Sequence, residues 1–404
     1  MDTVDDQQPA STAAPAQVSL REKSEEAFHL SEVVTIAAAH GAHDTYFSYL
    51  PTILPLLIKS LSLNTTQAGL LTACSQIPSL LQPAIGHLAD HKNLKLLVIL
   101  APALSGIFLT LVGVAPSFGV AAALLLLAGL STAAFHAIAP SMVGVQSGRK
   151  VGRGLGFFMV GGEIGFGVGP VMVVAVVSYL TLKGLPWLAS VGILASVILY
   201  FRLKQVSTVR HAQAEAGLPV RQALLEMRWL MLPVLLASLS TAFLNAEIVT
   251  YLPTFLASEG VAFSRAGISL AVVELSGTVG VFLMGLFSDR VGQRNIAVIG
   301  TVGSAAFSMG FLLLNGWLQI VMLLGIGMCA FVANPAYLSM VQTHFVRNRS
   351  LANGVYMSST FILRSIVVVI VGLLADRFGM RSVFMGSTWL ALLAVPIIFT
   401  LPLR

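Results

Sequence analysis

Two histidines and an aspartate stand close together inside the first long apolar segment of the chain. His40, His43 and Asp44 occupy positions i, i+3 and i+4, which a helix places on one face. A charged side chain at bilayer depth costs about 2.5–3.5 kcal/mol on insertion scales, so such residues usually face a bundle interior or an aqueous path. A carboxylate there can bind and release a proton when its surroundings change. We therefore expect Asp44 to carry proton coupling, with a structural hydrogen-bonding role as the alternative.

Other ionisable and polar residues lie in later apolar segments. The candidate proton-coupling residues are Asp44, Glu247, Glu163 and Glu274. The candidate substrate-binding residues, which offer positive charge, hydrogen-bonding groups or an aromatic ring, are His40, His43, Tyr46, His136, Asn245, Asn334 and Arg364. Glu163 and Arg364 could instead form a structural ion pair, because they stand at near-equivalent positions in the two halves of the chain.

The histidines also allow a metal hypothesis, since imidazole and carboxylate at these spacings can share an ion. Against it, the chain has no clear cysteine ligand and no second helix with two histidines, and Asn245 stands where a repeat would need a ligand. Metal-ion transport is therefore the weaker hypothesis, and we expect no metal site and no cofactor. Walker, H-E-x-x-H and G-x-S-x-G sequences are also absent, so we do not expect an enzyme.

The composition is typical of a membrane protein. Hydrophobic residues make up 56% of the 404 positions and charged residues only 10%. Twelve apolar spans of about 20 residues each fit this length with short loops. The net charge of +6 comes largely from Lys and Arg in short loops on the side of the N-terminus. This pattern follows the positive-inside rule and does not suggest nucleic-acid binding, so we expect a multi-pass protein of the cell (inner) membrane with both termini cytoplasmic.

The chain is expected to contain two similar halves. The expected parts are a disordered cytoplasmic tail (1–28), a six-helix bundle (29–203), a cytoplasmic linker (204–228) and a second six-helix bundle (229–404). Tyr49-Leu-Pro-Thr52 recurs half a chain later as Tyr251-Leu-Pro-Thr254. Two parallel six-helix halves are the arrangement of major facilitator transporters. The predicted fold is therefore an all-α membrane protein with twelve transmembrane helices.

A loop signature follows the second and the eighth span. Both copies resemble the major facilitator pattern G-x-L-A-D-R-x-G-R-K. Glycine permits close helix approach, and the aspartate can pair with basic groups or accept hydrogen bonds from a helix terminus. A capped basic loop is the simpler alternative. The residues expected to form a conformational latch are Gly86, Asp90, Gly285, Asp289 and Arg290.

Two further patterns carry no firm functional meaning at this level. A third copy of the loop signature, Gly372 to Arg381 with Asp376-Arg377 inside it, follows span 11 on the expected outer side, where its charge breaks the loop rule. Span 5 contains closely spaced glycines from Gly161 to Gly169. Such residues allow helices to pack backbone to backbone, and an export-specific role is the alternative.

The first half is similar to the fosmidomycin-resistance family of efflux transporters. The matching stretches are His40-x-x-His43-Asp44, Ser79-Leu-Leu-Gln82-Pro83-x-x-Gly86, Phe135-His136, Ser147-Gly148-Arg149-Lys150 and Val160-Gly161-Gly162 through Gly169-Pro170. The family pattern continues after Phe-His with proline and a carboxylate, whereas Ala137 and Ile138 follow here. If that carboxylate serves coupling in relatives, this chain must use another group, such as Asp44, Glu163 or Glu247.

The repeat and the resemblance together imply a secondary transporter that works by alternating access. We expect proton-coupled efflux, by antiport, of small amphipathic or anionic organic compounds by a monomer in the lipid bilayer. The alternative is proton-coupled or facilitated uptake of a small metabolite. A non-transporting receptor would need a sizeable soluble domain, and the longest polar stretches are only about 25 residues.

Overall fold

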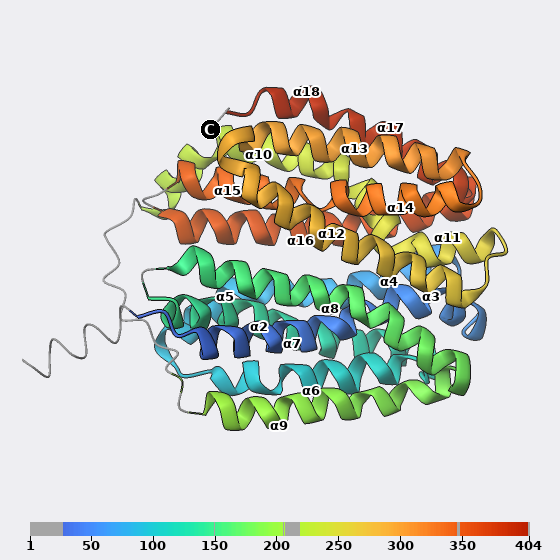
Figure 1. The fold of residues 1–404 in the computed structure, drawn as a ribbon, viewed down its shortest axis with the longest axis horizontal. Coiled ribbons are helices and arrows are strands. Elements are labelled where there is room, and N and C mark those ends of the chain that lie inside the picture. Colours follow the sequence, from blue (N-terminus) through green and yellow to red (C-terminus); the bar gives the residue numbers. More distant parts are fainter. Residues whose placement is uncertain (1–26, 149, 205, 207–218, 346–347, 403–404) are drawn as a thin grey trace, which may run out of the picture.

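The computed structural model describes residues 27–148, 150–204, 206, 219–345 and 348–402, with the backbone alone at positions 90, 91, 220, 288, 289, 349 and 350. This part of the chain folds into helices, without a strand. Positions 1–26 of the expected tail and positions 205 and 207–218 of the expected linker lie outside the described residues, whereas residues 220–228 of that linker form the start of the helix Val220–Ala246. The helices run along one common direction and form two groups, which are the two halves of the chain (Figure 1).

The first half occupies the lower part of Figure 1 and the second half the upper part. The helices of the first half are α2 (Leu30–Phe47), α3 (Tyr49–Ser60), α4 (Thr65–Gln76), η1 (Ile77–Leu81), α5 (Gln82–His91), α6 (Lys95–Val112), α7 (Phe118–Gln146), α8 (Val151–Leu180), η2 (Leu182–Leu188) and α9 (Ala189–Leu203). Those of the second half are α10 (Val220–Ala246), η3 (Glu247–Tyr251), α11 (Leu252–Ser258), α12 (Phe263–Val291), α13 (Gln293–Leu313), α14 (Trp317–Ala330), α15 (Ala333–His344), α16 (Arg349–Phe378), α17 (Met380–Leu392) and α18 (Ala394–Phe399).

Ten helical stretches in the described part are long and apolar enough to cross a membrane. The two remaining expected spans are interrupted: α2 passes into α3 at Ser48, and η1 separates α4 from α5. Proline explains both breaks, because it lacks the N–H that would bond to the carbonyl four residues earlier. Pro51 leaves the Phe47 carbonyl without this bond, and Pro78 starts the tight turn of η1. With these broken helices included, the architecture is consistent with the twelve predicted spans.

The repeated Tyr-Leu-Pro-Thr sequence begins at a helix irregularity in both halves. In the first half it follows Ser48, where α2 passes into α3, and in the second half it begins at Tyr251, the last residue of the π-helical turn η3. Pro253 plays the same part there as Pro51, since it cannot bond to the carbonyl of Val249. The first span of each half is thus irregular close to its buried ionisable residues, Asp44 and Glu247.

We call the end where α2 begins and α18 ends the terminal end, and the opposite end the far end (Figure 1). One hydrophobic core joins both halves toward the far end, with Tyr49 and Ile53 of α3 in the same cluster as Tyr251 and Phe255. Toward the terminal end each half has its own core instead. The halves therefore close on each other at the far end.

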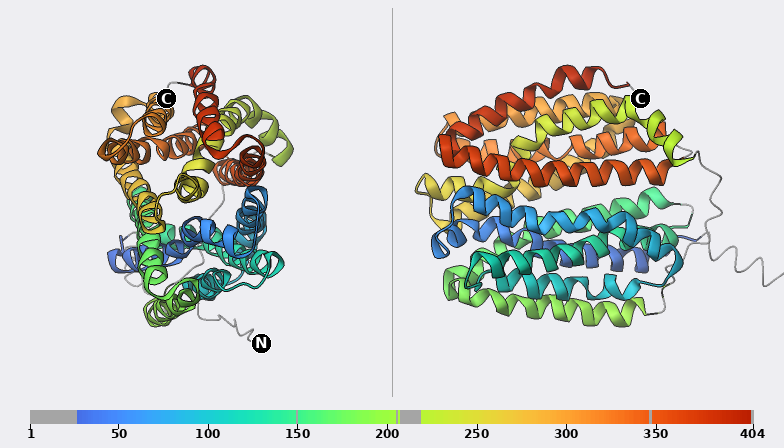
Figure 2. Two further views of the ribbon diagram at one scale, coloured as in Figure 1. Left: turned by 90° about the vertical axis from the view of Figure 1, so that its right-hand side faces the viewer. Right: turned by 180° about the vertical axis from the view of Figure 1, so that it is seen from behind.

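The helices that bring the halves together follow the same pattern. The seams between the halves pair α4 with α16 and α8 with α12, while α3 meets α11 at the far end. End-on and rear views show the two groups of helices on either side of this seam (Figure 2). By contrast, α5 and α15, at the terminal end, pack only within their own halves among the main helix pairs.

Candidate functional site

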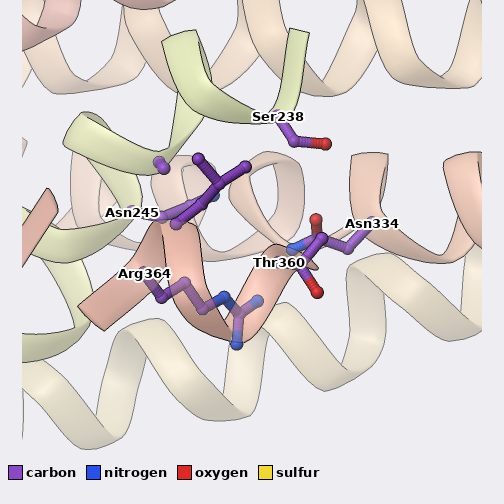
Figure 3. Close-up of a pocket in the computed structure, with 7 residues that line it drawn as sticks. Ser238, Asn245, Asn334, Thr360 and Arg364 are labelled. Carbon is purple, nitrogen blue, oxygen red and sulfur yellow. The ribbon is translucent and has the colours of Figure 1, made fainter. Parts of the chain in front are cut away.

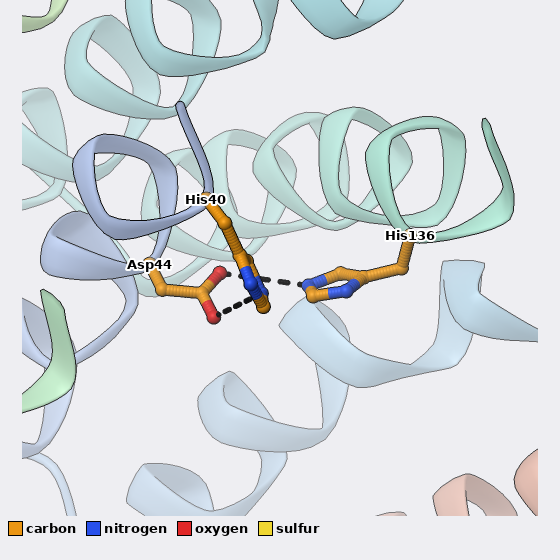
Figure 4. Close-up of side chains that lie close together, drawn as sticks. All are labelled: His40, Asp44 and His136. Atoms are coloured by element: carbon orange, nitrogen blue, oxygen red, sulfur yellow. Dashed lines mark ion pairs between the residues drawn. The ribbon is translucent and has the colours of Figure 1, made fainter. Parts of the chain in front are cut away.

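Asp44 lies at the centre of a histidine cluster (Figure 4). Its Oδ2 atom is 2.9 Å from Nε2 of His40, and its Oδ1 atom is 3.5 Å from Nε2 of His136 on α7. Nε2 of His43 is 3.9 Å from Oδ1. The Asp44 and His40 side chains are each 5% exposed, whereas that of His136 is 26% exposed. Solvent therefore reaches the cluster on the His136 side.

The other ring nitrogen of His40 fixes its protonation pattern. Nδ1 lies 2.7 Å from the carbonyl oxygen of Phe158, which can only accept a hydrogen bond, so Nδ1 carries a proton. The ring also stacks on the Phe158 ring at a centroid distance of 3.9 Å. Nε2 stands 2.9 Å from Oδ2 of Asp44 but makes no well-formed hydrogen bond within the described residues, so the contact is an ion pair by distance. A buried carboxylate is favoured by a positive charge beside it, so a charged His40 ring would stabilise Asp44 here.

His43 makes its hydrogen bonds to hydroxyl groups of the first half. Its Nδ1 is 3.0 Å from Ser105 Oγ and its Nε2 is 3.3 Å from Thr132 Oγ1, and the side chain is fully buried. Thr132 donates its proton to the Ala128 carbonyl, so it accepts from Nε2. Both His43 nitrogens are thereby satisfied, and the ring braces α2 against α6 and α7.

The glycines of α8 explain how α2 is held in register with the cluster. Gly161 and Gly165 lie so close to the backbone carbonyls of Ala37 and Gly41 that a Cβ atom at either position would clash. Gly162 leaves room for the His40 ring in the same way. The span-5 glycine pattern is thus close backbone packing, which seats His40 against Phe158.

A second polar group lines a pocket of the second half (Figure 3). Asn245 of α10, Asn334 of α15 and Arg364 of α16 surround it, together with Ser238 and Thr360. Its cavity of about 10 Å³ holds about one water molecule. The structure thus brings three of the predicted substrate-binding residues together, in a conformation with no room for an organic molecule in that pocket.

The other predicted acidic residues lie apart from both groups. Glu163 on α8 and Glu274 on α12 flank the seam between the halves and are close enough to Arg364 to interact electrostatically. The described residues form no ion pair between Glu163 and Arg364. Glu247 is fully buried in η3, and neither carboxylate oxygen makes a well-formed hydrogen bond within the described residues. Ser387 of α17 is its polar neighbour.

Tyr46 and the described residues of the expected conformational latch lie outside both polar groups. Tyr46 is buried and donates a hydrogen bond to the Leu188 carbonyl, 2.8 Å away. Gly86 and Gly285 have open space where a Cβ atom would stand, so no helix approaches them closely here. Arg290 is exposed at the end of α12. The side chains of Asp90 and Asp289 lie outside the described residues.

The cluster also has the donor types of a metal site. Ligand atoms of His40, Asp44 and His136 all lie within 4.8 Å of one another. Nδ1 of His40 donates to a carbonyl, which is how metal-bound histidines are commonly oriented. These donors therefore fit the metal alternative that the sequence also allowed.

The sequence profile of the Major Facilitator Superfamily matches residues 36–368. The chain belongs to this superfamily. The fosmidomycin resistance protein of Escherichia coli (strain K12) is 25% identical over 383 residues, covering 90% of this chain and 91% of that protein. The uncharacterized MFS-type transporter YfnC of Bacillus subtilis (strain 168) is 24% identical and covers 92% of both chains.

Solved structures of superfamily transporters share the fold. A bacterial homolog of the human lysosomal transporter Spinster, in an inward-facing and unoccupied conformation, superposes with a TM-score of 0.74 at 14% identity, covering 92% of this chain and 96% of that one. The D-xylose-proton symporter gives a TM-score of 0.72 at 13% identity, covering 93% and 98%. At such identities the likeness establishes the fold alone. Membership of the superfamily, together with its long apolar helices, makes this chain a multi-pass membrane transporter.

Sequence reasoning did not identify several residues that shape the site. Phe158, Ser105 and Thr132 orient the two histidines of α2. A hydroxyl or aromatic residue in an apolar span is too common to single out. For Phe158 the only local signal was its position one turn before the span-5 glycines, which dock α8 on α2.

Proposed function

We propose that this transporter exports small amphipathic or anionic organic compounds in exchange for protons. The observation that carries the proposal is the buried His40–Asp44 pair, in which a proton on the ring would balance the charge of the carboxylate. Loss of that proton would leave an uncompensated carboxylate charge in a nearly dry site, which disfavours this arrangement of the two side chains. Proton release at this point is thereby coupled to a movement of side chains on α2.

The position of the pair favours coupling to conformation. His40 is anchored to α8 through Phe158, and α8 forms one of the two seams with the second half. A change in the pair is therefore transmitted to a helix that must move when the halves rock. Glu163 lies on the same helix, and Glu274 and Arg364 are its neighbours across the seam. We assign Glu163, Glu274 and Glu247 as further proton-coupling residues.

The substrate would bind between the cluster and the pocket of the second half. His136 and Arg364 are the partly exposed cationic or donor groups on the two sides, and Asn245 and Asn334 add amide groups. Because the far end is closed, we infer that both sides are reached from the terminal end. With the termini in the cytoplasm of the cell, this is an inward-facing state that can accept a compound from the cytoplasm.

The direction of transport is inferred from a relative. The similar protein of Escherichia coli is named for fosmidomycin resistance, which suggests efflux. Structures of the same fold include a nucleoside transporter and a D-xylose-proton symporter, so uptake of a small metabolite is the second candidate function. Cells that overproduce an exporter accumulate less of its substrate, whereas cells that overproduce an importer accumulate more.

Purified protein in proteoliposomes tests the proposed function. Fosmidomycin is the first compound to try, followed by other small organic anions. With an imposed pH gradient, we expect the compound to move in the direction opposite to the proton flow. This flux of the compound should cease when a proton ionophore is added. Flux that is indifferent to the gradient would reject proton coupling.

The metal hypothesis is tested in the same vesicles. If the His40, Asp44 and His136 cluster carries a cation, zinc or manganese uptake should depend on His136, and a chelator should alter transport. On our proposal neither metal is transported, and a chelator leaves organic-anion flux unchanged.

A further inference from the structure

Asp376, near the end of α16, binds the beginning of α4 in the opposite half. Its Oδ1 atom accepts a hydrogen bond from the Thr65 backbone N–H at 2.7 Å. Its Oδ2 atom accepts from the Thr66 backbone N–H at 2.8 Å and from the Thr66 hydroxyl at 2.5 Å. A carboxylate at a helix N-terminus is favoured both by these unpaired N–H groups and by the helix dipole. One side chain thus makes three hydrogen bonds across the seam.

The first half does not need Asp376 to form α4. Asn64 and Gln67 already make a capping box at this helix start, in which each side chain bonds to the other residue's backbone N–H. Only the first two N–H groups of the helix, those of Thr65 and Thr66, are left for a partner outside the half. The contact can therefore break, with water replacing the carboxylate, while α4 stays folded.

Next to this contact, α4 and α16 pack backbone to backbone at two glycines. A Cβ atom on Gly69 would lie 2.7 Å from the Val368 carbonyl oxygen, and one on Gly372 would lie 2.5 Å from the Thr65 carbonyl oxygen. The Tyr251 hydroxyl sits between the two glycines and donates to the Val368 carbonyl at 2.8 Å. Tyr251 belongs to η3, so the seam also contacts the π-helical turn in the second half's first span.

The other seam, between α8 and α12, has no acidic residue at the corresponding place on α8. The last two turns of α8, residues 173–180, contain no acidic residue. The carboxylate on α16 is therefore not a general consequence of the twofold repeat. It belongs to the third copy of the loop signature, the copy that breaks the loop-charge rule.

We propose that Asp376 is a far-end latch, which holds the two halves together in the conformation described here and releases when the far end opens. Its place in a transport cycle rests on the alternating access of the proposed function. The latch affects the equilibrium between the closed and the open far end. This equilibrium can be measured without any substrate.

The latch is tested by distances between spin labels in purified protein in lipid nanodiscs. Cys74 and Cys329 are first replaced by serine, and labels are placed at Ser60→Cys and Ser258→Cys, exposed positions at the ends of α3 and α11. The parent protein should give one dominant short distance. Asp376→Ala should add a longer distance and shift the open-to-closed ratio by roughly tenfold, which corresponds to about 1.4 kcal/mol.

Two further variants make the result specific. Thr65→Pro removes one N–H donor while proline remains well tolerated at the first position of a helix, so it should also populate the longer distance. Glu259→Gln alters a carboxylate at the same end that pairs with Arg381 inside the second half, and it should leave the distances unchanged. Unchanged distances in both Asp376→Ala and Thr65→Pro, with normal melting temperatures, would overturn the latch. An equal shift in Glu259→Gln would overturn it as well.

An overpacking substitution in the α4–α16 seam provides an independent measurement. Gly69→Ala should force α4 away from α16 and lengthen the distance, whereas Gly119→Ala, which has open space at the start of α7, should not. If vesicles show no proton-coupled flux but the distances shift as stated, the proposed function fails and the latch stands. If flux is proton-coupled but the distances do not shift, the latch fails and the proposed function stands.

Discussion

Nε2 of His40 lies 2.9 Å from Oδ2 of Asp44, one helical turn further along α2. Nδ1 of His40 donates to the Phe158 carbonyl, and a second proton on Nε2 would give the ring the positive charge that favours the buried carboxylate. Both side chains are only 5% exposed, so little water is available to compensate the carboxylate charge if the ring loses this proton. This relationship links protonation of the pair to the packing of α2 against α8.

The first prediction concerns pH. In an antiporter the bound proton and the substrate exclude each other, so the substrate should bind more tightly as the pH rises and the pair loses its proton. A thermal-shift titration in detergent at two pH values should show greater stabilisation at the higher pH for a given substrate concentration. In Asp44→Asn, which cannot bind the proton, the difference between the two pH values should disappear. Equal stabilisation at both pH values in the parent protein would argue against competition.

The second prediction concerns the glycine seam between α2 and α8. Gly165→Ala places a methyl group against the Gly41 backbone carbonyl, and overpacking of this kind costs about 1–3 kcal/mol. Gly156→Ala is the matched control on the same helix, since its Cβ atom meets open space. It should stabilise the helix by about 0.5–1 kcal/mol, because alanine has the higher helix propensity. Melting temperatures that move in the same direction in both variants would contradict the packing argument.

The third prediction concerns the pocket of the second half. Arg364→Gln should weaken the binding of an anionic substrate about tenfold or more, because hydrogen bonds to charged groups contribute about 1.5–3 kcal/mol. Arg364→Lys should restore only part of the affinity, since lysine keeps the charge but not the planar fork. Arg265→Gln, an exposed arginine at the start of α12, is the control. Substrate affinity that is unchanged in Arg364→Gln would place the anion elsewhere.

Hydrophobic periodicity and the internal repeat were sufficient to predict the helical fold, because membrane spans are set by length and composition. The meeting of Asp44 with His136 could also be expected, since the superfamily arrangement places their spans around one cavity. Side-chain direction could not: His43 shares a helix face with His40 in the sequence pattern, yet it turns toward Ser105 and Thr132. That choice depends on hydroxyl groups of other helices, which local spacing does not reveal.

The third loop signature illustrates the same limit. The sequence placed Asp376 on an unexplained loop, and its partner lies more than half a chain away at Thr65 and Thr66. Backbone N–H groups carry no sequence signal, so a carboxylate that binds them can be recognised only once the two helices are seen together.

The most direct test of the account is to count the protons that leave the protein when substrate binds. Purified protein in a weakly buffered detergent solution is titrated with a substrate found by thermal shift, and the pH change is followed with an indicator dye. We predict proton release from the parent protein and from Glu259→Gln, and none from Asp44→Asn, with folding of all three checked by melting. Release from Asp44→Asn equal to that of the parent protein would contradict the assignment of the coupled proton to the His40–Asp44 pair.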